Sequence, residues 1–391
     1  MDNIEYMYKI RLSYLYNNEL IELGHENILA CVIDYNYDEK NMPIVMITAN
    51  IDKNLVDDMV LHCNDKCMNL TIYKYKRYIE LDIDEEYIKG EFKYFLPSSI
   101  INSRKDLDYD NDNKETKDYY RRITIGLLSK ELLDTNKKLI NEVVDSAGLT
   151  DVLTYHLQYR KLLIEPTNNS IIKDFMIPPM VSIASFVDFI DNVYPLYDTQ
   201  YRLFYNFDKT YLLSSSGKGL KSIDEEYNNV MININNATSR DSTVQGMEVN
   251  KESRYYSFQS HISDVNYNEN RYGKESFNKI ITINEKGEKN IVDLGNGNDK
   301  SNIERITTGN INKAKILKNK IKDSEFIINI SKTGLDASIL TINKQYYIKN
   351  NNIMSDKDGI YLLIRNREIY IKEDTNYLLN NLLSFKKIQS Q

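Results

Sequence analysis

Hydrophobic and polar residues between positions 175 and 214 predict an extended segment, a helix and a hairpin in direct succession. Pro178 and Pro179 favour extended backbone, because the proline ring fixes φ and restricts the residue before it. Ser182 can cap the helix, whose apolar residues recur at helical spacing and form one stripe. These residues are Ile183, Phe186, Val187, Ile190, Val193 and Tyr194. Pro195 ends the helix after about three turns.

Two short aromatic runs follow the helix and predict a β-hairpin. They span residues 201–207 and 211–213, with Asp208 and Lys209 between them. Aromatic residues favour strands and the polar pair favours a turn, whose type stays open because the pair is not Asn-Gly. We call residues 175–214 the central module. We predict that its core contains Pro178, Pro179, Phe186, Ile190, Tyr194, Phe204 and Phe207.

Residues 1–100 contain several runs in which apolar and polar residues alternate, as in strands with one buried face. The clearest run spans residues 71–84. We predict a buried face made of Tyr73, Tyr75, Ile79, Leu81 and Ile83. The wet face then carries Lys74, Lys76, Glu80, Asp82 and Asp84. Several such strands joined by short turns predict an antiparallel barrel or sandwich.

Residues 103–118 contain almost no large apolar side chain and predict a mobile loop or linker. Beyond them, residues 139–147 show helical spacing closed by Gly148, and Thr150 can cap a further short helix. The fold class predicted is α+β, mainly β. Its parts are a strand-rich domain at 1–102, a linker at 103–118, a mixed α/β middle domain at 119–214 and a strand-rich domain with long polar loops at 215–391.

Strand patterns return in the last part of the chain, for example at residues 230–234 and 279–283. The run at 359–372 is expected to fold back on itself at 365–367, where three polar residues interrupt it. Periodicity leaves the tail at 376–385 open between a short helix and an edge strand. The segments that read as loops are 235–250 and 284–312.

Composition narrows the range of functions. The net charge of −7 and the pI of about 5.4 argue against a protein that grips nucleic acid by a basic surface. No run of apolar residues is long enough for a membrane span, and the N-terminus lacks a signal-peptide pattern, so we expect synthesis in a cytoplasm. The odd count of 3 cysteines fits reduced thiols better than a disulfide framework.

Motifs for catalysis, cofactors and metals are weak. The loop at 214–219 lacks the glycine spacing of a phosphate loop, and the acidic run at 108–119 lacks the glycine and final glutamate of a calcium loop. The His and Cys residues within 62–67, even with Cys31, do not match zinc spacing. No nucleophile stands beside a base in a known catalytic motif. We therefore predict no catalytic residue, no cofactor and no metal site.

The central module resembles the baseplate hub proteins of contractile-tailed bacteriophages, which join the tail tube to the central spike. The residues that carry the resemblance are 162–164, 177–180, Phe186, Ile190, Tyr194, Tyr197, 202–208 and 211–213, with a looser match at 338–344, 347–348 and 359–361. Pro195 departs from the family, in which many members have glycine. The resemblance implies two tube-like antiparallel β-barrel domains, at 1–102 and 215–391.

The resemblance also implies a homotrimeric ring in the virion that matches a six-fold tail tube to a three-fold spike. Its partners would be the tail tube protein, the central spike protein, other baseplate proteins and tape-measure proteins. DNA would pass through the channel without specific binding, and an acidic lining formed by Glu80, Asp82 and Asp84 would keep it from sticking. Two other functions stay open: a tail-associated peptidoglycan hydrolase, and a peripheral receptor-binding tail protein with tyrosine-rich contact loops.

Overall fold

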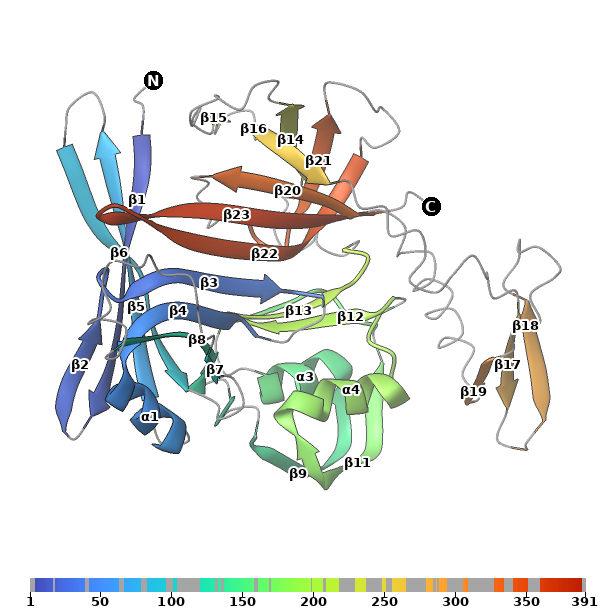
Figure 1. The fold of residues 1–391 in the computed structure, drawn as a ribbon. Helices are drawn as coiled ribbons and strands as arrows, with labels where there is room; N and C mark the ends of the chain where they lie inside the picture. Colours follow the sequence, from blue (N-terminus) through green and yellow to red (C-terminus); the bar gives the residue numbers. More distant parts are fainter. Residues whose placement is uncertain are drawn as a thin grey trace.

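The computed structural model of the 391-residue chain is mainly β, as predicted (Figure 1). All structural statements below concern the residues that it describes. These are 4–16, 18–38, 42–62, 67–78, 83–95, 101–103, 120–130, 133–134, 137–157, 161–168, 170–197, 199–206, 209–217, 229–236, 248–250, 255–264, 279–283, 286, 288–293, 305–308, 327–333, 340–350 and 359–388.

Eight strands pair in a closed circle that forms the first barrel, and every pairing in it is antiparallel. In order around the circle they are β22 (Gly359–Glu373), β3 (Ile28–Asn36), β4 (Ile44–Asp52), β8 (Tyr120–Ser129), β6 (Ile83–Phe95), β5 (Cys67–Tyr78), β1 (Ile4–Tyr16) and β23 (Asn376–Lys387). Strands β2 (Glu19–Leu23) and β7 (Ile101–Ser103) add to β1 and β8, and helix α1 (Lys53–His62) follows β4. Alternate side chains from these strands fill one apolar core.

Six strands close a second circle. They are β14 (Asn229–Asn236), β21 (Gln345–Asn350), β22, β23, β20 (Ile327–Thr333) and β16 (Tyr255–Asp264). Strand β14 runs parallel to both of its neighbours, so this second barrel is mixed where the resemblance implied an antiparallel one. Strand β15 (Glu248–Asn250) extends β16. The barrel has its own apolar core, to which β21, β22 and β23 contribute.

A middle region lies below the second barrel and beside the first in Figure 1. It contains β9 (Leu139–Gly148), α3 (Leu149–Leu157), β10 (Lys161–Ile164), β11 (Ile171–Ser182), α4 (Ile183–Val193), β12 (Tyr201–Tyr205) and β13 (Lys209–Ser214). Helices α3 and α4 pack on the two-stranded sheet β9–β11 in a third core. The predicted helix α4, with Ser182 as its N-cap, and the hairpin β12–β13 are both confirmed.

Three predictions of secondary structure are wrong. Residues 139–147 form strand β9, because a spacing of four between buried Ile140 and Val144 fits the period of a strand as well as that of a helix. Both ranges read as loops contain strands. The range 235–250 includes β15, and 284–312 includes β18 (Lys289–Asp293) and β19 (Arg305–Thr308), which pair with β17 (Lys279–Ile283). Residues 359–372 do not fold back at 365–367 but lie within the single strand β22.

The buried face of β5 is also the opposite of the one predicted. Leu70, Ile72 and Lys74 point into the first core, whereas Tyr73 and Tyr75 are half-exposed. Lys74 is buried, and its Nζ lies 4.0 Å from the centre of the Tyr6 ring, whose face attracts a cation. The run at 71–84 is not one strand either, because β5 ends at residue 78 and β6 begins at residue 83.

Candidate functional site at the junction of the two barrels

Strands β22 and β23 belong to both barrels, and we call this pair the shared hairpin (Figure 1). Residues 359–362 of β22 pair with β21 of the second barrel, whereas residues 365–371 pair with β3 of the first. On β23, Tyr377 pairs with β1 of the first barrel and residues 380–386 pair with β20 of the second. Each strand therefore passes from one barrel to the other without a break.

The two barrels lie on the same face of the shared hairpin. Along β23 the buried side chains alternate regularly, with Tyr377 in the first core and Phe385 in the second. On β22 the pairing shifts by one residue, because Leu363 pairs with Phe385 and Arg365 with Ser384. Ile364 is the extra residue of a β-bulge, which changes the side to which the following side chains point. The bulge thus keeps one face inside both barrels.

Two groups from outside the hairpin bind the backbone of this bulge. Arg202 of β12 donates a hydrogen bond from Nη1 to the carbonyl oxygen of Leu363 at 3.4 Å. The backbone N–H of Tyr37, just after β3, donates to the carbonyl oxygen of Ile364 at 2.9 Å. The central module and the first barrel therefore both hold the point at which β22 changes barrels.

Arg202 is a buried cation at this junction, with 5% of its surface exposed. Its Nε donates to the carbonyl oxygen of Ser214 at 3.3 Å, which ties β12 to the end of β13. Burial lowers the pKa of Arg202, and the negative charges of Asp38 and Glu165 act in the opposite direction. Since a buried charge is costly without compensation, these partners are needed to keep the cation in place.

Glu165 is the buried carboxylate of the same network. Its two oxygens accept hydrogen bonds from the backbone N–H and the hydroxyl of Ser214, at 2.7 and 2.8 Å. The hydroxyl of Tyr197 donates to the carbonyl oxygens of Glu165 and Leu212, at 3.0 and 3.1 Å. The network continues to β21, because Gln345 donates from Nε2 to the carbonyl oxygen of Gly217 at 2.7 Å.

Apolar packing joins the central module to the second barrel at the same place. Phe204 of β12 is fully buried, and its ring meets the Tyr37 ring edge-on with 4.6 Å between the ring centres. Both side chains belong to the core that contains Leu362 and Leu363 of the bulge, together with Leu213 of β13. The junction is therefore held by aromatic packing and by a buried charged network. Its donors and acceptors bind backbone groups, and the hydroxyl of Ser214, which donates to Glu165, is buried.

The predicted core of the central module divides between two places. Phe186 and Ile190 are fully buried in the core of the middle region, and Tyr194 packs against it half-buried. Phe204 lies in the core of the second barrel, and Phe207 falls outside the described residues. Pro178 is half-buried, whereas Pro179 is exposed and so does not pack in a core. Both prolines lie where the pairing of β11 with β9 is interrupted between Ile177 and Val181.

Of the predicted lumen residues, Glu80 and Asp82 fall outside the described part of the chain. Asp84 lies at the start of β6, opposite Arg77 of β5. The sequence did not single out Arg202 as a buried cation or Glu165 as its neighbour. The one available signal was the position of Arg202, a single charge in an otherwise apolar and aromatic strand.

Metal ligands do not gather in the part of the chain that the structure describes, which holds no group of three or more such residues. Cys31 is buried and Cys67 is half-buried as free thiols, while Cys63 lies outside that part. Among its helices, none has the length and the apolar character needed to cross a membrane.

His156 gives the middle region a pH dependence that can be measured. Its Nε2 lies 2.8 Å from Oε2 of Glu142, and its ring packs on Phe186. Burial lowers the pKa of His156 from 6.5, and Glu142 offsets part of that shift. The unfolded chain therefore takes up the proton first, so stability is complete above pH 6.5 and falls as the pH drops below it.

We expect the thermal midpoint of the wild type to fall between pH 7 and pH 5 by more than that of His156→Gln, which cannot titrate. Circular dichroism at a series of pH values measures both. Equal slopes for the two proteins would contradict the assignment to His156.

Comparison with known proteins identifies the family. The family model described as "Bacteriophage PBS1 gene 109 protein" matches residues 4–388. The chain belongs to this bacteriophage family. No curated protein matches the chain. The resemblance to phage tail proteins that the sequence indicated is confirmed at this level.

Solved structures share the fold at low sequence identity. The tail protein from Neisseria meningitidis MC58 has a TM-score of 0.52 and 10% identity, over 98% of this chain and 97% of that one. A chain of the Francisella PdpA-VgrG complex, half-lidded, has a TM-score of 0.53 and 10% identity, over 100% of this chain and 59% of that one. The family member described here is thus a bacteriophage protein with the fold of a tail protein.

Proposed function

We propose that the chain is the baseplate hub of a contractile phage tail, a homotrimeric ring that joins the six-fold tail tube to the three-fold central spike. The observation that supports this most is the shared hairpin, which holds two barrels side by side in one chain. Three such chains around a three-fold axis would present six barrels in a circle. One ring would then match six-fold symmetry on one side and three-fold symmetry on the other.

The junction described above fits this role. A symmetry adaptor must hold its two barrels in a fixed relation, because each must meet an equivalent site on the tube. Arg202 and Phe204 fasten the central module to the place where β22 changes barrels. In this proposal the central module sets the angle between the barrels. The partners are the tail tube protein, the central spike protein, other baseplate proteins and tape-measure proteins.

The proposed role is structural and not enzymatic, and its location is the baseplate of the virion after synthesis in the host cytoplasm. The acidic residues Glu80, Asp82 and Asp84 remain candidates for the channel lining, through which DNA would pass without specific binding. The junction uses its charged groups to hold backbone carbonyls and amides, which supports a structural role.

Mass measurement in solution with and without the spike protein tests the proposal. We expect a particle of three chains of 45.9 kDa each, at least when the spike is present, with a central hole in low-resolution images. A particle that stays monomeric with the spike and tube proteins, or an oligomer without a hole, would exclude a hub.

A further inference from the structure

Strands β3, β22, β23 and β20 form an unbroken stretch of sheet that crosses from the first barrel to the second. Because the bulge at Ile364 keeps one face inside both barrels, the opposite face also runs across both of them. It is half-exposed along β23, whereas on β22 it is covered at Leu362 and Ile364, which are buried. We call the side chains that point outward from these four strands the outer wall. It runs from Asp34 on β3 through Arg365 and Ser384 to Asn329 on β20.

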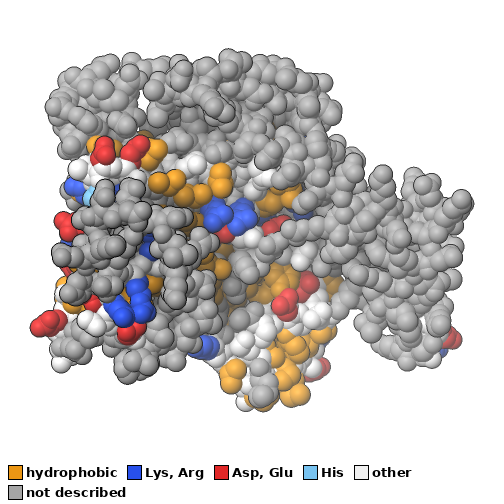
Figure 2. Space-filling model, in the orientation of Figure 1, with side chains coloured by type: hydrophobic (Ala, Val, Ile, Leu, Met, Phe, Trp, Pro, Cys, Tyr) orange, Lys and Arg blue, Asp and Glu red, His pale blue; other side chains and the backbone are white. Residues whose placement is uncertain are grey.

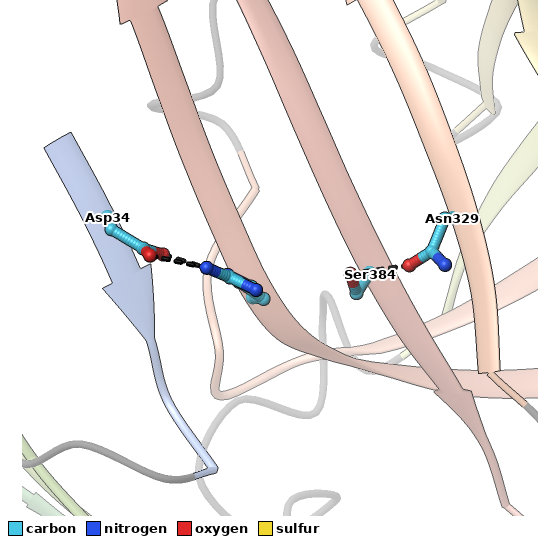
Figure 3. Close-up of polar contacts among 4 residues, drawn as sticks. Asp34, Asn329 and Ser384 are labelled. Atoms are coloured by element: carbon cyan, nitrogen blue, oxygen red, sulfur yellow. Dashed lines mark hydrogen bonds and ion pairs between the residues drawn. The ribbon is translucent and has the colours of Figure 1, made fainter. Parts of the chain in front are cut away.

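Polar side chains on the outer wall bind one another across neighbouring strands (Figure 3). Arg365 of β22 holds Asp34 of β3 through two contacts, one of them from Nε to Oδ1 at 2.8 Å. The hydroxyl of Ser384 donates to Oδ1 of Asn329 at 2.7 Å. Such paired groups have little need of a further partner, so the surface offers few strong contacts to a passing molecule.

The charge on the outer wall differs from that of the whole chain. The wall carries Arg365, Arg367 and Lys386 against two carboxylates, Asp34 and Glu373, a small basic excess in a chain of net charge −7. Figure 2 shows Lys and Arg side chains beside Asp and Glu side chains in the middle of the molecule, over β3 and β22. Exposed basic groups attract phosphate in a salt-dependent way, and one ion pair among them limits that attraction.

We propose that the outer wall faces the central channel of the ring, and that Arg367 and Lys386 meet the phosphates of double-stranded DNA as it passes. The proposal rests on the hub function proposed above. The continuity of the wall along β23 supports it, because three copies would line the circle with one kind of surface. In this arrangement the wall replaces Glu80, Asp82 and Asp84 as the channel lining. Its small basic excess matches the charge of the duplex, and its cross-strand pairs keep the contact weak enough for movement.

Cysteine reactivity in the assembled ring tests the direction in which the wall faces. Cys63→Ser and Cys67→Ser leave buried Cys31 as the one native thiol, and Asn380→Cys then places a thiol on the wall. We expect this thiol to react with N-ethylmaleimide but not with a maleimide on a long polyethylene glycol chain, which is too bulky for the channel. The control, Lys173→Cys on the exposed surface of β11, should react with both reagents.

The possible outcomes separate the two proposals. If a ring forms and the cysteine at position 380 reacts with both reagents, the wall faces outward and the inference is overturned while the hub stands. If no ring of this chain is found in assembled tails, the hub function fails and the inference fails with it.

Binding of a short DNA duplex to the isolated protein tests whether the outer wall contacts DNA. We expect weak binding by fluorescence anisotropy at low salt. In Arg367→Gln/Lys386→Gln, the slope of log affinity against log salt should fall by about 0.9 for each phosphate that the variant no longer neutralises. Lys173→Gln is the control and should keep the wild-type slope. Absence of duplex binding at low salt, or an unchanged slope in the double variant, would exclude DNA as the occupant of the wall.

Discussion

Arg202→Met is expected to lower the free energy of unfolding by about 3–5 kcal/mol, the range found when one partner of a buried charged network is removed. Methionine replaces the aliphatic part of the arginine side chain but donates no hydrogen bond. The carbonyl oxygens of Ser214 and Leu363 would each lose a donor, and buried Glu165 would lose a nearby cation. Denaturant unfolding followed by circular dichroism measures the change.

Two further variants test whether the loss of stability in Arg202→Met comes from the loss of the buried charge. Arg121→Met removes an arginine whose Nη1 lies 3.4 Å from Asp57 but whose side chain is 45% exposed, so it should change stability by less than about 1 kcal/mol. Adding Glu165→Gln to Arg202→Met should recover part of the loss, because it removes the uncompensated negative charge. If Arg202→Met were as stable as Arg121→Met, the network would not hold the junction.

Phe204→Ala is the second change with a large expected effect, a loss of about 3–5 kcal/mol, as is usual for a fully buried aromatic side chain. Phe204 has no exposed surface and packs edge-on against Tyr37 within the second core. The cavity left by its removal would lie at the bulge of β22. We therefore expect faster hydrogen exchange of backbone amides around Ile364 than in the wild type.

Phe186→Ala provides the matched control, because Phe186 is equally buried but lies in the core of the middle region. It should destabilise the protein by a similar amount and speed up exchange in α3 and α4, with little change at the bulge. Exchange at the bulge that is equal in the two variants would mean that Phe204 has no special part in fastening the module to the barrels.

The sequence correctly predicted the helix and the hairpin that are determined by residues close together in the chain. Helix α4 has its N-cap at Ser182, where the backbone N–H donates to Oγ of Ser185 at 3.2 Å, and Pro195 follows its end. Its apolar stripe includes Phe186 and Ile190, which are buried as predicted. The hairpin β12–β13 was predicted correctly from its two short aromatic runs.

The wrong predictions arose where a local pattern is compatible with two secondary structures, or where a contact between residues far apart in sequence determines which structure forms. In β5, Lys74 lies on the same buried face as Leu70 and Ile72, although alternation within residues 71–84 places a lysine in water. Its Nζ lies over the ring of Tyr6, a contact that this segment alone does not reveal. Residues 365–367 read as a turn because they are polar. Arg365 is instead accommodated in a strand by Asp34, which lies 331 residues away in sequence.

The junction could not be predicted from the sequence for the same reason. The pairing of β22 with β3 and the contact of Arg202 with Leu363 join parts of the chain that are far apart, and no periodicity encodes them. The resemblance to a family implied two barrels, at 1–102 and 215–391. It did not indicate that β22 and β23 belong to both of them.

Ile364 has a consequence for how this chain can change over time. Because Ile364 is the extra residue opposite β23, its loss would leave Leu363 and Arg365 adjacent to each other and opposite Phe385 and Ser384, and every other side chain of β22 would keep its side. A residue inserted elsewhere in β22 without a bulge of its own would instead turn the side chains of one barrel outward. We therefore expect related genes to lose the residue at this position more readily than they gain one elsewhere in β22.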